Sequence, residues 1–237
     1  KSTLKNFLKF SLGIGLFIPL LKSQPSNAAT PCPVNDSVTT MSGQANPCFT
    51  TPEKLEVTFF EIGFCSSDPL STGTFDYSTC SKTWDNTSGY KTDIGKKSFE
   101  DMVGNVYKVP NATYSHAYAI MNNTWTYKAK YKLSDGNTYY TNSTNGLVTT
   151  NESEYGEWTD DISNMVGEET TDKCFDYTAS TDEGTVTAIL TNESLVTATD
   201  TSTCESATRV IGSIALNSSV KIDNNVIQTI DSNADLE

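Results

Sequence analysis

The stretch Lys54–Cys65, Lys-Leu-Glu-Val-Thr-Phe-Phe-Glu-Ile-Gly-Phe-Cys, decides the fold class. Leu55, Val57 and Phe59 alternate with polar residues, and this period of two is typical of a half-buried strand. After Phe59 the apolar residues change parity, which a bulge or a strand covered on both faces explains. Gly63 suits a kink or the close approach of another backbone. The stretch therefore predicts the core strand of a β domain.

Further β segments follow at short intervals, with turn residues between them. Asn122-Asn123 and Asp135-Gly136 are typical turn pairs, and they predict a three-stranded meander around Trp125–Leu133. Such spacing, without a long amphipathic helix, indicates an all-β fold, an antiparallel β-sandwich or a jelly-roll-like domain. The other strands are expected at Tyr114–Ile120, Tyr139–Tyr140, Thr185–Leu190, Leu195–Thr199, Arg209–Leu216, Val220–Ile222 and Val226–Ile230.

The chain is expected to have three parts. Residues 1–28 combine a basic start, a short uncharged apolar run and small residues, which predicts a secretion signal cleaved after Ala28 or Ala29, or a retained anchor helix. Residues 29–53 are rich in Pro, Ser, Thr and Asn and predict an extended arm. Residues 54–237 form the β domain, with a sub-boundary near 90–110. A Ser/Thr/Asp-rich loop is expected over Ser66–Gly89, and short helices at Lys97–Val103 and Asp160–Val166.

The six cysteines predict disulfides. An even cysteine count in an exported chain favours disulfides over metal binding. Local spacing suggests one pair in the arm, one after the core strand and one near the C-terminal strands. The pairs are Cys32–Cys48, Cys65–Cys80 and Cys174–Cys204.

The charge balance excludes two classes of partner. Residues 1–28 hold four Lys and no acidic residue, so the rest of the chain carries 12 basic and 29 acidic residues, a net charge of −17. Such a surface repels nucleic acid and anionic lipid, so neither is expected as a partner once the signal is removed. Self-association, other cell-surface components and glycans remain as partners.

The residue types of a catalytic site are sparse. His116 is the only histidine, and it lies on an expected strand beside two tyrosines, which favours a structural role over catalysis. Two carboxylates in one cleft would indicate a glycoside hydrolase, but acidic pairs arise by chance in so acidic a chain. Calcium is the most plausible ion and no other cofactor is expected. The best carboxylate cluster for it is Glu157, Asp160 and Asp161.

Aromatic residues give a second binding hypothesis. An exposed Trp or Tyr in a concave groove would favour glycan binding, and the candidates are Trp84, Trp125 and Trp158. The competing interpretation is that these side chains are core or loop anchors.

One segment supports a family-level resemblance. Glu61-Ile-Gly-Phe-Cys65-Ser-Ser-Asp-Pro-Leu70, with Phe75-Asp76 and Cys80, resembles a pattern in uncharacterised exported surface proteins of planktonic marine bacteria. The resemblance covers about residues 45–90, and it implies export and a β-rich surface role. It brings no active site with it.

The sequence therefore predicts a non-enzymatic, disulfide-stapled protein of the extracellular cell surface, with a structural or adhesive role. If it forms filaments, the arm (29–52) or the last strand (226–230) would complete a neighbour's sheet. A secreted glycan-binding module is the first alternative, and a glycoside hydrolase is the second.

Overall fold

The structure is a computed structural model that describes residues 30–31, 48–49, 52–95, 102–133, 135–162, 176–180, 184–223 and 226–229. The predicted signal or anchor at 1–28, most of the arm, and residues 97–101 of the predicted helix at Lys97–Val103 lie outside these residues. Among the described residues, no helix has both the length and the apolar character needed to cross a membrane.

The described chain is mostly β and its sheets are largely antiparallel, as predicted. The strands are β1 Thr30–Pro31, β2 Cys48–Phe49, β3 Lys54–Cys65, β4 Cys80–Asp93, β5 Asn105–Val106, β6 Ala112–Asn122, β7 Thr124–Lys128, β8 Lys130–Lys132, β9 Thr138–Thr141, β10 Val148–Thr149, β11 Trp158–Asp161, β12 Asp176–Ser180, β13 Gly184–Thr191, β14 Arg209–Asp223 and β15 Val226–Thr229. The short helices are η1 Tyr77–Thr79, η2 Glu152–Glu154 and α4 Thr201–Glu205.

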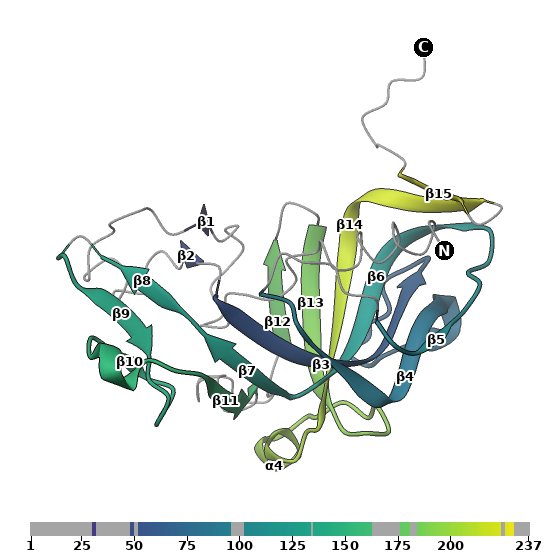
Figure 1. Cartoon of the computed structure of the whole chain (residues 1–237). Helices are drawn as coiled ribbons and strands as arrows, with labels where there is room; N and C mark the ends of the chain where they lie inside the picture. The colour runs from purple at the N-terminus through teal and green to yellow at the C-terminus, as the bar shows by residue number, and fades with distance from the viewer. Residues whose placement is uncertain are drawn as a thin grey trace.

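Strand β3 lies inside a ten-stranded sheet and is hydrogen-bonded to other strands along both of its own edges. One edge pairs with β4, and the other pairs first with β7 and then with β6 (Figure 1). The sheet continues from β6 through β14 and β13 to β12, and β11 lies outside β7. Strands β8, β9 and β10 form a separate sheet on the left of the view, and β1 pairs with β2 in parallel. The predicted core strand is confirmed with the same bounds.

The change of parity after Phe59 is a β-bulge. The register of β3 against both β4 and β6 shifts between Phe59 and Glu61. The bulge lets residues on both sides of it face one large core, which includes Leu55, Val57, Phe59 and Phe64 of β3. Phe60 instead packs against a smaller cluster on the other face, under the loop that follows β3.

Gly63 is needed for packing. A Cβ at this position would lie 2.5 Å from the Tyr118 ring and 2.6 Å from the backbone oxygen of Ser81. The predicted close approach of another backbone is therefore confirmed, because β4 and the Tyr118 ring of β6 both close on this residue.

The predicted turn at Asn122-Asn123 is wrong. Strands β6 and β7 run on in the same direction along one edge of β3 instead of folding back on each other. Asn123 is 2 % exposed and has ordinary negative φ. Its backbone N–H donates to Thr208 O at 3.1 Å, its side-chain amide donates to Ala207 O at 3.1 Å, and its carbonyl accepts from Ile162 N at 2.9 Å.

Asn123 therefore marks a branch in the sheet. Before it, the outer neighbour of the strand is β14; after it, the outer neighbour is β11. The residue bonds to the chain just before β14 and just after β11, so one buried side chain and its peptide groups close the gap where the two neighbours diverge. Tertiary contacts override the turn propensity of the Asn pair.

Other boundaries also differ from expectation. The expected loop Ser66–Gly89 becomes the long strand β4 from Cys80 onward, because its Thr and aromatic residues suit a strand and its charged groups find partners. The expected strand Leu195–Thr199 is a turn with positive φ at Leu195 and a single bridge at Thr197. Arg209–Leu216 and Val220–Ile222 form one strand, β14, with a register shift between Ala215 and Val220.

Several expectations hold. Thr185–Leu190 lies in β13, and Asp135-Gly136 turns the chain between β8 and β9 with positive φ at Gly136. The described part of 90–110 contributes the end of β4 and the strand β5 that pairs with it. Asp160 and Asp161 belong to β11, and residues 163–166 of the predicted helix lie outside the described residues.

Candidate functional site

The most concentrated polar cluster surrounds Lys82 on β4. Lys82 Nζ lies 2.7 Å from Asp85 Oδ2 and 3.2 Å from Glu61 Oε2. Glu61 follows the bulge of β3, and a second register shift between Ile62 and Gly63 changes the phase of β4 near Lys82. The two irregularities bring all three charged side chains to one place. Both carboxylates are nearly buried, with side-chain exposures of 12 % and 11 %.

Neutral groups complete the hydrogen bonding of both carboxylates. Tyr118 OH donates to Glu61 Oε1 at 2.7 Å. Asn105 Nδ2 and Tyr107 OH donate to the two oxygens of Asp85 at 2.9 and 3.0 Å. The Lys82 ammonium also lies 5.2 Å from the centre of the Tyr107 ring. This Lys82 cluster, formed by Glu61, Lys82, Asp85, Asn105, Tyr107 and Tyr118, joins β3, β4, β6 and the segment around β5.

The electrostatics of the cluster favour an ion pair. The hydrogen bond from Lys82 is the main cause that holds the pKa of Asp85 below its usual value, and Asn105 and Tyr107 act in the same direction. The hydrogen bond to Asp85 is the main cause that raises the pKa of Lys82. Burial first, and Glu61 second, raise the pKa of Tyr118. Asp85 is therefore unsuited to be the protonated acid of a glycosidase.

A disulfide lies beside the Lys82 cluster. Cys65 and Cys80 pair across β3 and β4, which confirms the predicted local pairing. The disulfide closes the loop 66–79, and Phe75 of this loop packs on Tyr118 with ring centres 5.1 Å apart. Cys204 is also disulfide-bonded; its predicted partner Cys174 lies outside the described residues, as does Cys32, the predicted partner of Cys48.

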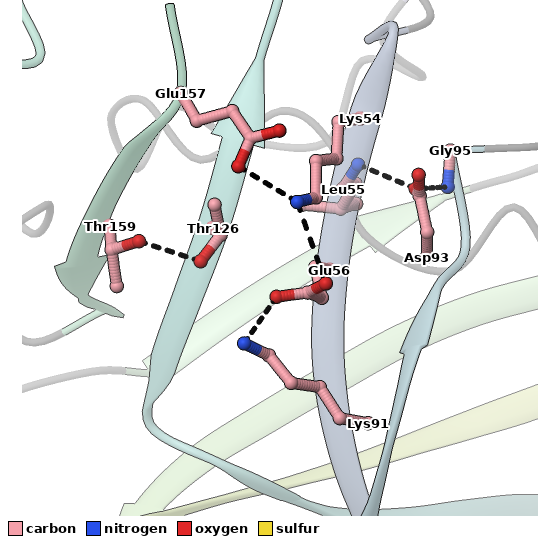
Figure 2. Close-up of polar contacts among 9 residues, drawn as sticks. All are labelled: Lys54, Leu55, Glu56, Lys91, Asp93, Gly95, Thr126, Glu157 and Thr159. Atoms are coloured by element: carbon pink, nitrogen blue, oxygen red, sulfur yellow. Dashed lines mark hydrogen bonds and ion pairs between the residues drawn. The ribbon is translucent and has the colours of Figure 1, made fainter. Parts of the chain in front are cut away.

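A second polar network crosses the start of β3. Figure 2 shows Lys54 Nζ between Glu157, at 2.8 Å, and Glu56, at 3.5 Å. Glu56 continues the row to Lys91 of β4, and the hydrogen bond from Lys91 is the main cause that lowers the pKa of Glu56. We call Glu157, Lys54, Glu56 and Lys91 the Lys54 ladder. It links the chain at β11 to β3 and β4 across the sheet.

Neutral hydrogen bonds run beside the Lys54 ladder. The hydroxyls of Thr126 and Thr159 lie 2.7 Å apart on β7 and β11 (Figure 2). Asp93 Oδ1 accepts from the backbone N–H groups of Leu55 and Gly95, each at 3.0 Å. Adjacent strands are thus tied by side chains in addition to their backbone ladders.

Lys54→Met is expected to lower the free energy of unfolding by about 0.2–1 kcal/mol, since exposed ion pairs contribute little and Glu157 is half exposed. The effect should shrink at high salt because salt screens exposed charges. Urea unfolding at low and high salt measures it, with Lys132→Met on the exposed side of β8 as the control. A loss that is the same at both salt concentrations would contradict this assignment.

The predicted aromatic binding residues are mostly core residues. Trp84 and Trp125 are each 2 % exposed and belong to the large core, so neither presents a ring face to solvent. Trp158 is half-buried over Gly146, where a Cβ would lie 2.4 Å from the indole. Trp84 and Trp125 are therefore wrong as glycan platforms. Among the residues whose burial the structure describes, the exposed aromatic ones are instead Tyr77 and Tyr107, at 44 % and 41 %.

The predicted calcium cluster does not form. Glu157 pairs with Lys54, Asp161 accepts from Thr124 Oγ1 at 2.6 Å, and Asp160 accepts from the Asp161 N–H at 2.8 Å. Successive residues of a strand point to opposite faces, which separates the two aspartates of β11. Within the described residues, no group of three or more acidic, His or Cys side chains could hold a metal ion.

His116 is half-buried on β6. Its Nδ1 lies 2.9 Å from Ser115 Oγ, and that hydroxyl donates to Ser66 O at 3.0 Å. The imidazole is then the donor to Ser115, which is the reverse of what a general base needs. Burial lowers the pKa of His116, and the charge of Asp68 opposes the shift.

The lowered pKa of His116 predicts a pH dependence of stability. The folded state favours the neutral imidazole, so its contribution is complete above the unfolded pKa of about 6.5 and is lost as the pH falls from there toward the folded pKa. Urea unfolding on both sides of that pH should show the loss in the wild type and a smaller loss in His116→Gln. Equal losses in both proteins would contradict the prediction.

Sequence reasoning missed Lys82, Asp85, Asn105 and Tyr107 as a cluster. Lys82 and Asp85 fall in the segment expected to be a loop, and their proximity depends on a bulge in β4. The sequence signal for a strand in this segment was the pair Thr83-Trp84, two β-favouring residues between the charged residues Lys82 and Asp85.

No protein-family model, curated protein or solved structure matches the chain.

Proposed function

We propose that this chain is a non-enzymatic structural or adhesive protein of the extracellular cell surface. The observation that supports the proposal is the density of cross-strand side-chain ties around β3. The Cys65–Cys80 disulfide, the Lys82 cluster and the Lys54 ladder each join β3 to neighbouring strands. A sheet tied in this way suits a protein that works through a stable shape. Oxidised cysteines also fit a location outside the cell.

The mode of assembly we propose is strand exchange through the arm. Strand β15 pairs with β14 of its own chain, so in this structure the last strand is already used. In the arm, β1 and β2 pair with each other, and neither pairs with the ten-stranded sheet. Within the described residues, β11 and β12 each have one edge without a partner strand, and such edges accept an added strand.

The experiment is assembly of the secreted full-length chain over a wide concentration range, followed by light scattering and negative-stain electron microscopy. We expect fibres or large oligomers, and we expect deletion of residues 32–47 to abolish them. Deletion of residues 231–237 is the matched control and should leave assembly intact. A chain that stays monomeric at every concentration would contradict strand exchange, and absence from the outer surface of immunolabelled cells would contradict the surface role.

Two finer expectations belong to the same proposal. The exported state rests on the leader-like residues 1–28 and on the disulfide. The sandwich or jelly-roll arrangement stays a prediction, and the observation that supports it is the presence of two separate hydrophobic clusters built on the ten-stranded sheet.

Glycan binding is the second candidate, and exposed tyrosines favour it. Tyr77 and Tyr107 are partly exposed beside the buried carboxylates Glu61 and Asp85, and aromatic rings next to hydrogen-bonding groups suit sugars. A glycan array with the wild type and Tyr107→Ala tests this candidate. Hits that disappear in the variant would support it, whereas an array without hits would count against it.

A further inference from the structure

Lys82 differs from the paired lysines Lys54, Lys91 and Lys130 because both of its acidic partners are nearly buried. Its Nζ contacts Asp85 Oδ2 at 2.7 Å and Glu61 Oε2 at 3.2 Å, and those side chains are 11 % and 12 % exposed. Lys54 also contacts two carboxylates, but its nearer partner, Glu157, is 51 % exposed. An amine and two carboxyl groups are thus held together, with both carboxyl groups nearly buried and the Lys82 side chain 36 % exposed.

We propose that Lys82 and Asp85 condense to form an intramolecular isopeptide bond, with Glu61 as the proton shuttle. The new bond joins Lys82 Nζ to Asp85 Cγ, and the bond that breaks joins Asp85 Cγ to one of its oxygens. That oxygen leaves as water with two protons from the ammonium. No oxidant, reductant or other reactant is required.

The contact distances place the reacting groups in range. With Nζ hydrogen-bonded to Oδ2, the amine lies next to the carboxyl carbon, close to the separation of about 3–3.5 Å typical of near-attack geometry. Thr83 is the extra residue at the register shift of β4, since Ile62 faces Trp84 and Gly63 faces Lys82. This bulge lets two side chains three residues apart meet. Rotation of the Asp85 carboxyl group about its Cβ–Cγ bond turns its face toward Nζ, and intramolecular reactions that reach such a near-attack geometry have effective molarities of about 10⁵–10⁸ M.

The resting ion pair already contains every proton that the reaction needs. Moving one proton from the Lys82 ammonium to Asp85 gives a neutral amine and a carboxylic acid, which is the reactive pair. The hydrogen bonds around the pair favour its charged form, so the neutral pair is the minor form and the amine attacks from it. Glu61 also touches Nζ, so it can accept the second proton after attack and pass it to the leaving oxygen.

The surrounding hydrogen bonds support Glu61 as the proton shuttle and Asp85 as the carboxyl group that Lys82 attacks. Tyr118 donates to Glu61 and fixes the position of the shuttle. Tyr107 and Asn105 donate to Asp85 and would stabilise negative charge on its oxygens during attack. The bond would convert a salt-sensitive ion pair into a covalent link that fixes the β4 bulge.

The test is the intact mass of the full chain after reduction of its disulfides. Peptide mapping establishes the N-terminus, and the measured mass is compared with the mass calculated for the sequence that starts there. We expect the wild type to be lighter by one water molecule. Lys82→Arg and Glu61→Gln should have their full sequence mass, whereas Lys91→Arg, which alters only an ion pair of the Lys54 ladder, should keep the deficit. Circular dichroism establishes that each variant is folded.

Peptide mapping of the wild type alone gives an independent readout. Trypsin should fail to cleave after Lys82, and the peptide that spans Lys82 and Asp85 should be lighter by one water. A wild type with full mass, both fresh and after prolonged incubation, would overturn the proposal. A water deficit that persists in Lys82→Arg would overturn it as well, because that deficit would come from another dehydration.

Discussion

Replacing Cys65 and Cys80 together with alanine is expected to lower the free energy of unfolding by about 3 kcal/mol, because the disulfide closes a loop of about 15 residues. The variant also releases the loop 66–79, whose Phe75 packs on Tyr118 of β6. Urea unfolding under non-reducing conditions measures the loss. Chymotrypsin should cleave at Phe75 and Tyr77 faster than in the wild type.

Ser71→Ala is the matched control for the disulfide variant, because Ser71 lies exposed in the same loop. It should change neither the unfolding midpoint nor the rate of cleavage. A double variant as stable as the wild type, with its loop still resistant to chymotrypsin, would show that the disulfide does not hold this loop in place.

Asn123→Ala is expected to lower the free energy of unfolding by about 1–3 kcal/mol, because Ala207 O is left buried without its side-chain donor. The loss should be accompanied by local opening at the branch. Hydrogen exchange should accelerate at Ile162 and Thr208, the residues on the two sides of the gap that Asn123 closes.

Asn122→Ala gives the comparison for Asn123, because Asn122 is the other half of the same sequence pair and is only half-buried. We expect a much smaller loss for Asn122→Ala. If the two variants lost equal stability, the importance of the branch contacts at Asn123 would be contradicted.

The Cys65–Cys80 disulfide and Asn123 show which features of the fold can be predicted from the sequence and which cannot. The bounds of β3 and its bulge follow from the apolar pattern of Lys54–Cys65, because a period of two and its interruption are local properties. The Cys65–Cys80 pair follows from spacing in the same way. The glycine turn at Gly136 follows from local backbone chemistry.

Asn123 shows the limit of local rules. The pair Asn122-Asn123 has the turn signature, but its conformation is set by Ala207, Thr208 and Ile162, which are distant in sequence. The Lys82 cluster shows the same limit, because Glu61 and Lys82 meet only through the pairing of β3 with β4. Burial of Trp84 likewise depends on long-range packing, so its aromatic character alone could not distinguish a core residue from a binding platform.

Hydrogen–deuterium exchange of the intact chain can establish whether β3 holds the sheet together through partners on both of its edges. We expect the amides of β3, β6 and β14 to exchange slowest and those of β8 to β10 to exchange much faster. If the amides of Val57–Phe64 exchanged as fast as those of β9, β3 would not be the organising strand of this protein.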